Sequence, residues 1–472
     1  MLFLSCNRRY LSREYFDLFT QQVRSRRTGA ARERTVAPTR RFRLDKAPAL
    51  AYLYGTSAPF TTRPVRMSRS LVRSLAVLGP GIAVAATGIG AGDVVTAAVA
   101  GARFGTVVLW AAVVGAAVKF VLNEGIARWQ LATGTTLLEG WGRHLHRAVL
   151  GGFMVYLVLW TVVVAGALIS ATGLAAHALV PQGSVAVWGV VHSLAALGLV
   201  AVGQYALFER LVKIFVGLMV GTVLLCAVLV EPAWGRLAQG LFVPHVPSGS
   251  GPFLLGVIGG VGGSVTLLSY SYWIRERDWT GPSARSLVRM DLGAAYVLTG
   301  LFGVATIVTA AGVDAEAVTG NTMALAIADR IGVVVGAAGK WTFLVGFWGA
   351  VFTSMLGVWQ GVPYLFADFV RILRGTDAEP VRTTSTPYRG YLLFTATVPM
   401  VLLVADRPVW IIIAYSVAGA LFMPFLAGTL LYMNNQAAWV ERMRNGWIAN
   451  ALLVGALVLF GYLCYTELAT RL

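Results

Sequence analysis

Residues Leu78 to Ala100 read LGPGIAVAATGIGAGDVVTAAVA, an apolar stretch long enough to cross a bilayer. Its middle contains Gly88, Gly90 and Gly92, followed at once by the carboxylate of Asp93. Each glycine destabilises a helix by about 1 kcal/mol relative to alanine, and a charge near the bilayer centre adds a penalty of at least about 2.5 kcal/mol. A helix that only spans the membrane does not carry both defects at one depth. The stretch therefore predicts a transmembrane helix broken near the midplane, where one acid lines a polar site.

A second apolar segment, which opens at Gly251-Pro252, repeats this pattern. Its small and hydroxyl residues are Gly259, Gly260, Gly262, Gly263, Ser264 and Thr266. Pro252 precedes Gly260 by eight positions, as Pro80 precedes Gly88. Close helix packing explains the glycines of either segment alone. The matched pair, with an acid in one member, points instead to the binding site of a transporter.

The composition defines the class of protein. Of the 472 residues, 57% are hydrophobic and only 12% are charged, which indicates a polytopic membrane protein. The three cysteines are scattered and suggest neither a disulfide framework nor a zinc site. No nucleophile–base set, HExxH helix or phosphate-binding loop is present, so we expect neither an enzyme nor a bound cofactor.

The basic charge of the chain is concentrated at its N-terminus. Residues 1–66 hold 14 Lys/Arg and 4 Asp/Glu, a net +10 of the total +17. A basic flank beside the first span fits the positive-inside rule, so this charge does not predict a nucleic-acid partner. We expect residues 1–66 to form a disordered extension and residues 67–472 to form the transporter domain, because Met67 begins a segment typical of the start of such a protein.

Apolar runs of about 20 residues predict eleven transmembrane helices. The runs lie at 76–100, 105–129, 149–173, 186–204, 207–230, 253–273, 288–311, 338–370, 389–405, 409–432 and 446–466. The second broken segment comes five spans after the first, an odd number, so it enters the membrane in the opposite sense. Spans one to five and six to ten then form an inverted repeat, to which span eleven is added.

Basic residues in alternate loops predict the orientation. They follow spans two, four, six, eight and ten: Arg143, Arg147, Arg210, Lys213, Arg275, Arg277, Arg285, Arg289, Arg371, Arg374, Arg382, Arg389, Arg442 and Arg444. These loops share the side of the basic tail. We therefore expect a multi-pass protein of the cytoplasmic membrane, with its N-terminus inside and its C-terminus outside.

Asp93 is the leading candidate ligand, because apolar sequence continues beyond it and removes the simpler explanation of a carboxylate that reaches the headgroups. Unwound carbonyls and a carboxylate are hard oxygen donors that suit Mg²⁺, Mn²⁺ or Ca²⁺. Span two adds Lys119, Asn123 and Glu124. Lys119 and Asn123 share one helical face, whereas Glu124 lies about 140° from Lys119 around the helix. Two interpretations stay open for these residues: they brace the structure, or they line an ion path. Gln360 in span eight is a candidate polar neighbour of the site.

Several motifs resemble the Nramp family of proton-coupled divalent-metal transporters. The specific match is LGPGIAVAATGIGAGDVVTAAVAGARFGTVVLW with the later ATGTTLLEGW, and weaker matches are VGGSVTLLSYSYW and VRMDLGAAY. The similarity extends over residues 75–460. It implies a LeuT-like fold, in which a five-plus-five inverted repeat has broken helices one and six.

The departures from this family fall on its metal site. Where the family has Asp-Pro-Gly-Asn, this chain has Gly90-Ala91-Gly92-Asp93, so the carboxylate has moved by about one helical turn. The family's Met-Pro-His aligns with Thr266-Leu267-Leu268, and the acids of its third helix align with Ala167 and Ser170. We therefore expect a divergent member without the soft metal ligand and without the family's proton route.

The leading hypothesis from the sequence is inward transport of a hard divalent cation of the Mg²⁺ or Mn²⁺ type by alternating access. The expected ligands are Asp93, carbonyls near Gly88, Gly90, Gly260 and Gly262, and the hydroxyls of Ser264 and Thr266. Two alternatives stay open: transport of a small organic solute such as an amino acid or amine, and a membrane sensor that transports nothing. The oligomeric state does not follow from the sequence.

Overall fold

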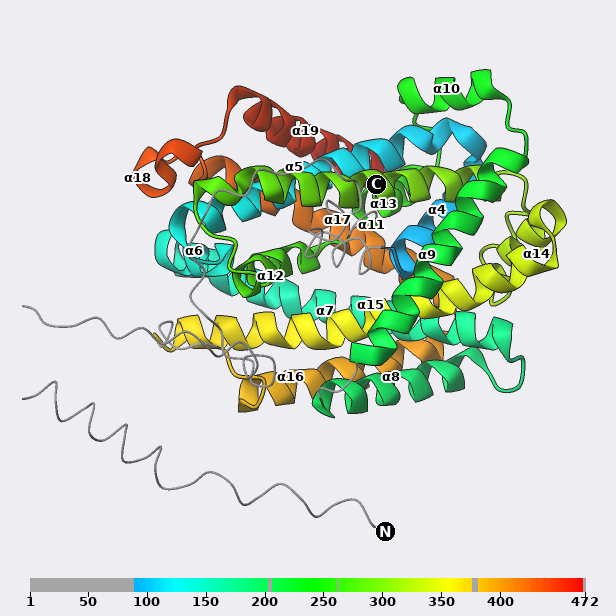
Figure 1. Ribbon diagram of the computed structural model, residues 1–472, viewed down its shortest axis with the longest axis horizontal. Helices are drawn as coiled ribbons and strands as arrows, with labels where there is room; N and C mark the ends of the chain where they lie inside the picture. The colour runs from blue at the N-terminus through cyan, green and yellow to red at the C-terminus, as the bar shows by residue number, and fades with distance from the viewer. Residues whose placement is uncertain (1–88, 203–205, 261–262, 376–380, 470–472) are drawn as a thin grey trace, which may run out of the picture. The chain divides into compact units, whose positions relative to one another are not determined.

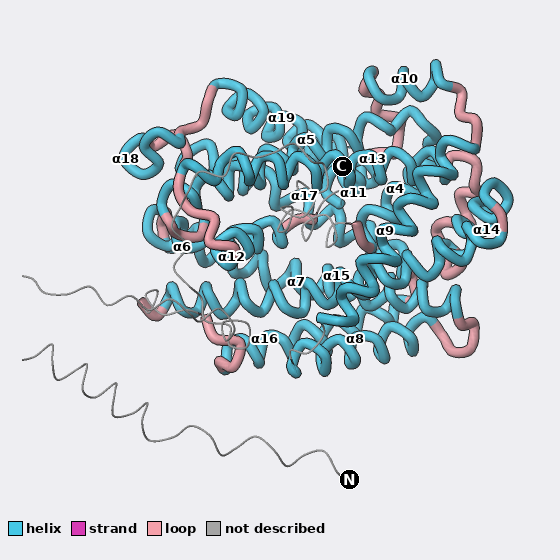
Figure 2. The backbone as a smooth tube through the Cα atoms, viewed as in Figure 1, coloured by secondary structure: helices cyan, strands magenta, loops and turns pink. Residues whose placement is uncertain are grey.

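The structure, a computed structural model, describes residues 89–202, 206–260, 263–375 and 381–469. Within these ranges the chain is helical and contains no strand (Figures 1 and 2). The basic segment 1–66 and the candidate ligands Gly88 and Gly262 lie outside the described residues. The division of the chain at Met67 stays a prediction.

Each of the eleven apolar runs overlaps a helix or a pair of helices, the first run only from Ala91 onward, because residues 76–88 lie outside the described ranges. They are α4 (Ala91–Phe104), α5 (Leu109–Thr133), α7 (Arg147–Leu179), α8 (Val185–Val202), α9 (Ala206–Leu229), α11 (Gly251–Gly260) with α12 (Ser269–Glu276), α13 (Arg285–Ala310), α15 (Ala337–Leu373), α16 (Thr386–Thr397) with η4 (Val398–Ala405), α17 (Pro408–Met433) and α19 (Trp447–Ala469). By length and composition, eight helical segments of the described chain could each cross a membrane, or up to ten if each bent pair is one span. The all-α polytopic class is confirmed.

Four short helices between the spans were not predicted, because they are shorter than a membrane crossing and a search for apolar runs of about 20 residues cannot detect them. They are α6 (Leu137–His144), α10 (Trp234–Phe242), α14 (Met323–Val335) and α18 (Ala437–Val440). One of them has a local signal. Thr136 and Glu139 form a capping box at the start of α6, in which each side chain accepts the other residue's backbone N–H.

Helix packing repeats with a shift of five spans. The fifth and eighth spans, α9 and α15, pack together, and so do their counterparts, the tenth and third spans α17 and α7. Likewise α7 packs on α8 as α15 packs on α16, and α4 packs on α13 as α11 packs on α5. Figure 1 shows α8 and α16 side by side at one edge of the bundle, while α5, α13 and α19 lie at the opposite edge. This correspondence is the inverted repeat expected from the sequence.

Gly259 lets α11 approach α17 at the level of the second break. A Cβ atom at this position would lie 2.4 Å from the carbonyl oxygen of Ser416 and 2.7 Å from Cβ of Ala420. We expect Gly259→Ala to destabilise the fold by about 1–3 kcal/mol, because the obstacle is backbone and cannot rotate away. Differential scanning fluorimetry of the purified protein measures this as a lower Tm. Gly428→Ala in α17 is the control, since nothing lies within 4 Å of that position, and an equal loss in both variants would contradict the packing argument.

Candidate functional site

The described part of the first apolar run begins at Ile89, and helix α4 begins at Ala91. Gly90 is the residue before the helix, with φ −139° and ψ −147°, and its carbonyl accepts the first helical hydrogen bond from Val94. Asp93 therefore stands in the first turn of α4, where its side chain is 1% exposed. The N-terminal end of a helix dipole stabilises a carboxylate at this position. The chain thus holds a buried acid in the first turn of α4.

The second break separates α11 from α12. Helix α11 ends at Gly260, Gly263 has a left-handed φ of +85°, and the short 3₁₀ helix η2 (Val265–Leu268) precedes α12. Ser264 is buried, and the Thr266 hydroxyl oxygen lies 2.7 Å from the place of a Cβ at Gly263. Any other residue at position 263 would be strained by the left-handed φ, and its Cβ would collide with the Thr266 hydroxyl. Glycine is therefore required there. The broken sixth span predicted from the glycine run is confirmed.

Glycines bring the two breaks into backbone contact. A Cβ at Gly260 would lie 3.2 Å from both the carbonyl carbon and the carbonyl oxygen of Gly92, and a Cβ at Gly92 would lie 3.4 Å from Cα of Gly260. Close packing, the simpler explanation of these glycines, therefore applies to both. It does not compete with a binding site here, because the same contact places the start of α4 beside the end of α11.

Lys119 reaches this point from α5. Its side chain is fully buried, and its Nζ donates hydrogen bonds to the carbonyl oxygen of Gly259, at 3.0 Å, and to that of Gly263. The Asp93 carboxylate also acts electrostatically on the ammonium. The carbonyls on both sides of the second break thus hold a positive charge that belongs to the protein. Sequence reasoning proposed Lys119 as a neighbour of the site and did not predict this contact.

Polar side chains from two further helices complete the surroundings of Asp93. Asn123, one turn beyond Lys119, donates from Nδ2 to the Tyr296 hydroxyl of α13 at 3.1 Å. Asp93 acts electrostatically on Tyr296 and on Tyr415 of α17. The two tyrosines were missed, because a single tyrosine in an apolar span has no local signal that separates it from a packing residue.

Glu124 and Gln360 have other surroundings. The Glu124 carboxylate is buried among three arginines, Arg128 of its own helix and Arg285 and Arg289 of α13. This separation from Lys119 follows the angle of about 140° between the two positions on the helix. Gln360 lies on α15 with an exposed side chain. Their suggested part in an ion path stays a prediction.

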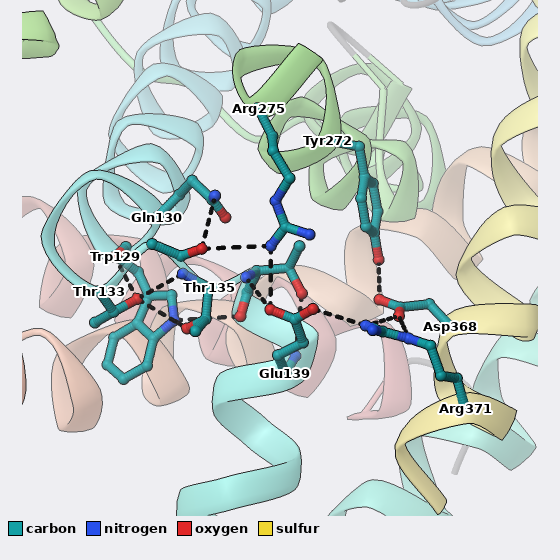
Figure 3. Close-up of polar contacts among 11 residues, drawn as sticks. Trp129, Gln130, Thr133, Thr135, Glu139, Tyr272, Arg275, Asp368 and Arg371 are labelled. Carbon is teal, nitrogen blue, oxygen red and sulfur yellow. Dashed lines mark hydrogen bonds and ion pairs between the residues drawn. The ribbon is translucent and has the colours of Figure 1, made fainter. Parts of the chain in front are cut away.

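A second polar network fastens the half-helix α12 to its neighbours (Figure 3). Arg371 of α15 binds Oε1 of Glu139 at 2.7 Å, and Arg275 of α12 binds Oε2 at 3.1 Å. Asp368 accepts from the Tyr272 hydroxyl at 2.6 Å and from Nε of Arg371 at 2.8 Å. The network joins α6, α12 and α15, so any movement of α12 must break it. The capping-box motif was the one local sign of Glu139, and its arginine partners come from distant parts of the chain.

The pKa of Glu139 is set by competing effects. Burial acts to raise it, but the hydrogen bonds from Arg371 and from the backbone N–H of Thr136, together with the charge of Arg275, outweigh burial and bring the pKa below the usual 4.5. Glu139 is therefore an ionised carboxylate at neutral pH.

The donors near the breaks define which ion they could bind. Among the described residues, no three His, Cys, Asp or Glu side chains lie together. The groups that lie beside Asp93 in the described chain include the carbonyl of Gly92, the backbone of Gly260 and the hydroxyl of Thr96. Such a set suits a hard ion that keeps part of its hydration shell.

Comparison with known proteins identifies the family. The sequence profile described as natural resistance-associated macrophage protein-like (Nramp) matches residues 81–470. The chain belongs to the Nramp-like family. A comparison of this Nramp-like chain with curated protein sequences gives no match.

Solved structures agree with the family on the fold. A histidine-to-alanine variant of the manganese transporter of Eremococcus coleocola superposes with a TM-score of 0.67 at 17% identity, over 86% of this chain and 89% of that chain. A glutamate-to-glutamine variant of the same transporter gives 0.66 at 18% identity, over 87% and 90%. The nucleobase-cation-symport-1 family transporter Mhp1 gives 0.50 at 13% identity, over 83% and 93%. At these identities the likeness establishes the fold, which is LeuT-like.

Proposed function

We propose that this Nramp-like protein is a secondary transporter that carries a hard divalent cation, of the Mg²⁺ or Mn²⁺ type, across the cytoplasmic membrane. Membership of the family and the many apolar helices support a multi-pass metal-ion transporter and give no support to an enzyme. The observation that carries the proposal is Asp93, a buried carboxylate in the first turn of α4, where this helix contacts the end of α11. In the proposed orientation the N-terminus is cytoplasmic and the C-terminus is outside.

The proposed ligand set is built from hard donors. Asp93 supplies the anionic ligand, and the carbonyls of the two breaks supply neutral ones, at Gly90 and Gly260 and at the undescribed Gly88 and Gly262. The Ser264 and Thr266 hydroxyls contribute directly or through water. Mg²⁺ and Mn²⁺ retain water readily, so water molecules would complete the coordination of the ion.

Lys119 has a defined place in this proposal. Its ammonium bonds to the Gly259 and Gly263 carbonyls, so it competes with an entering cation for the same region. Release of these carbonyls is then a step that accompanies ion binding. The ammonium also keeps the region near neutrality when no ion is bound, which lowers the penalty of a lone buried carboxylate.

The same charge pair favours a second candidate. A carboxylate and an ammonium side by side complement a small zwitterion such as an amino acid, whose amine would approach Asp93 and whose carboxylate would approach Lys119. This solute would place Lys119 among the required ligands. By contrast, the positive charge of Lys119 would oppose the binding of a divalent cation.

Uptake into proteoliposomes tests the proposed function. Purified protein is reconstituted, and saturable uptake of Mg²⁺, Mn²⁺ and Cd²⁺ is measured beside that of a set of labelled amino acids and amines. We expect saturable uptake of Mg²⁺ or Mn²⁺ in preference to the softer Cd²⁺. Uptake of an organic solute that ignores all three ions would establish the second candidate, and no uptake by folded protein would favour a sensor.

Lys119→Met separates the two candidates independently. Methionine keeps the length of the side chain and removes the positive charge, so we expect affinity for the divalent ion to rise by about tenfold or more, since a neighbouring unit charge contributes one to several kcal/mol. Isothermal titration calorimetry measures it. Lys340→Met is the control, because Lys340 pairs with the exposed Asp329 at 2.5 Å. Loss of all substrate binding in the Lys119 variant would support an organic zwitterion.

A further inference from the structure

A long cavity lies between α5 and α13, closed at its sides by α10 and by the start of α19, and it has a volume of about 1000 Å³. Most of its lining is apolar: Val113, Phe120, Val297, Leu301, Ile448 and Leu452. Several of these side chains are widely exposed, including Val297 at 63% and Leu301 at 53%. A water-filled path for ions would have polar walls. Exposed apolar walls on the outer helices of a membrane protein fit hydrocarbon.

The floor of this groove is made of small residues. A Cβ at Gly300 of α13 would lie 3.0 Å from Cβ of Ala116 on α5, so the two helices nearly touch there. At Gly293 the nearest atom is a ring carbon of Phe120, 4.0 Å away. The groove is therefore a shallow channel along the helix pair.

One end of the groove carries a cluster of charges. The Glu124 carboxylate meets Nε of Arg285 at 3.6 Å and Nε of Arg289 at 3.5 Å, and it also binds Arg128. Arg128 donates to Oδ1 of Asn445 at 2.7 Å. Three guanidinium groups surround one carboxylate, so the cluster has a net charge of +2. The side chains of Arg285 and Arg289 are 35% and 55% exposed, and both residues line the groove.

The cluster keeps unused hydrogen-bonding capacity. Arg128 is 3% exposed, and its Nε atom, like that of Arg285, has no hydrogen-bond partner among the described residues. Buried guanidinium groups usually form all the bonds they can. Both Nε atoms are buried, so an anionic group at this end would meet the exposed parts of the Arg285 and Arg289 side chains instead.

The dimensions suit one acyl chain. The groove follows α5 from Arg128 to Val113, which is roughly 22 Å at 1.5 Å per residue, close to the length of a long fatty acyl chain. Trp447 stands beside the charged end with 80% of its surface exposed, as is typical of tryptophans at the level of lipid headgroups. The loops that contribute the arginines belong to the side that the positive-inside pattern assigns to the cytoplasm, where anionic lipids are enriched.

We propose that the groove between α5, α13 and α19 binds an anionic phospholipid, whose phosphate lies on Arg285 and Arg289 and whose acyl chain runs along Val297 and Leu301 toward Val113. Glu124 orients the arginines and prevents their mutual repulsion. Since α5 also carries Lys119 and α13 carries Tyr296, the lipid would contact the two helices that bring these side chains to the Asp93 site.

Native mass spectrometry of the full chain in detergent tests the lipid site. Phosphatidylglycerol and phosphatidylcholine with the same acyl chains are titrated separately, beside glycerophosphoglycerol, which has the headgroup without the chains. We expect preferential binding of phosphatidylglycerol and none of the free headgroup. Arg285→Gln/Arg289→Gln should weaken phosphatidylglycerol binding by roughly 30-fold, given the contribution of each arginine beside an anionic lipid.

Two further variants keep the test decisive. Arg382→Gln/Arg389→Gln removes the same charge from exposed positions outside the groove and should leave binding unchanged. Val297→Trp fills the groove and should weaken binding of the long-chain lipid while all arginines remain in place. This variant tests the lipid site if the arginine variant does not fold. Equal affinity for the two lipids, retained preference in the groove variants, or an equal loss in the control variant would each overturn the proposal.

Discussion

Replacing Asp93 by alanine is expected to abolish saturable uptake of divalent cations. Asp93 is the only anionic ligand in the proposed set, and its loss leaves neutral oxygens and the Lys119 ammonium to face the ion. We expect the rate at limiting ion concentration to fall by about 100-fold or more, since even groups that only support a metal ligand contribute about 10–100-fold. Proteoliposome uptake of Mn²⁺ measures the change.

Two controls accompany this variant. Asp93→Asn keeps the shape of the side chain and removes its charge, so it should lose uptake as well, and unimpaired uptake in this variant would contradict the role of the carboxylate. Asp314→Ala removes a carboxylate from an exposed loop and should transport normally. Because Lys119 loses its electrostatic partner in both Asp93 variants, folding is checked by size-exclusion chromatography before uptake is compared.

The second large effect is expected at Glu139. Glu139→Gln removes the charge that Arg371 and Arg275 share, and it leaves Arg371, which is 11% exposed, short of one of its anionic partners. We expect a loss of about 3 kcal/mol in the free energy of unfolding, as for other broken buried ion pairs. Thermal unfolding in detergent near pH 7 measures it. Glu316→Gln, in an exposed loop, should unfold as the unchanged protein does.

The effect of Glu139 depends on pH in a defined direction. Because the pKa of Glu139 is lower in the folded protein than its usual 4.5, the ionised network contributes its full stability above about pH 4.5. That contribution is lost as the pH falls through the folded-state pKa. The difference in Tm between the unchanged protein and Glu139→Gln should therefore narrow on acidification below pH 4.5, and a difference that widened there would contradict the assigned charge state.

The sequence predicted the breaks in the helices because their signals are local. Glycines destabilise a helix wherever they stand, and a carboxylate in an apolar run is conspicuous without any knowledge of the fold. The start of α4 beside Gly90 and the left-handed Gly263 lie where those signals indicated. The periodicity of α5 placed Lys119 and Glu124 about 140° apart and so argued against an ion pair between them, and each of the two has other partners.

The partners of these residues did not follow from the sequence, because they depend on tertiary packing. Lys119 bonds to Gly259, 140 positions later, and Arg371 bonds to Glu139, 232 positions earlier. Many carbonyls and acids were equally available to either cation in the sequence alone. The positions of Tyr296 and Tyr415 also depend on tertiary packing, since only the fold shows which of the chain's 16 tyrosines lie near Asp93.

The central claim is that a divalent cation binds at Asp93 between the two helix breaks, and locating the ion tests this most directly. Crystals of the full chain grown with Mn²⁺ would be measured at the manganese absorption edge, where the anomalous signal marks the metal alone. We predict a peak within coordination distance of the Asp93 carboxylate, with the Lys119 ammonium withdrawn from the Gly259 and Gly263 carbonyls. A well-occupied manganese peak elsewhere, with Lys119 still bound to those carbonyls, would contradict the claim.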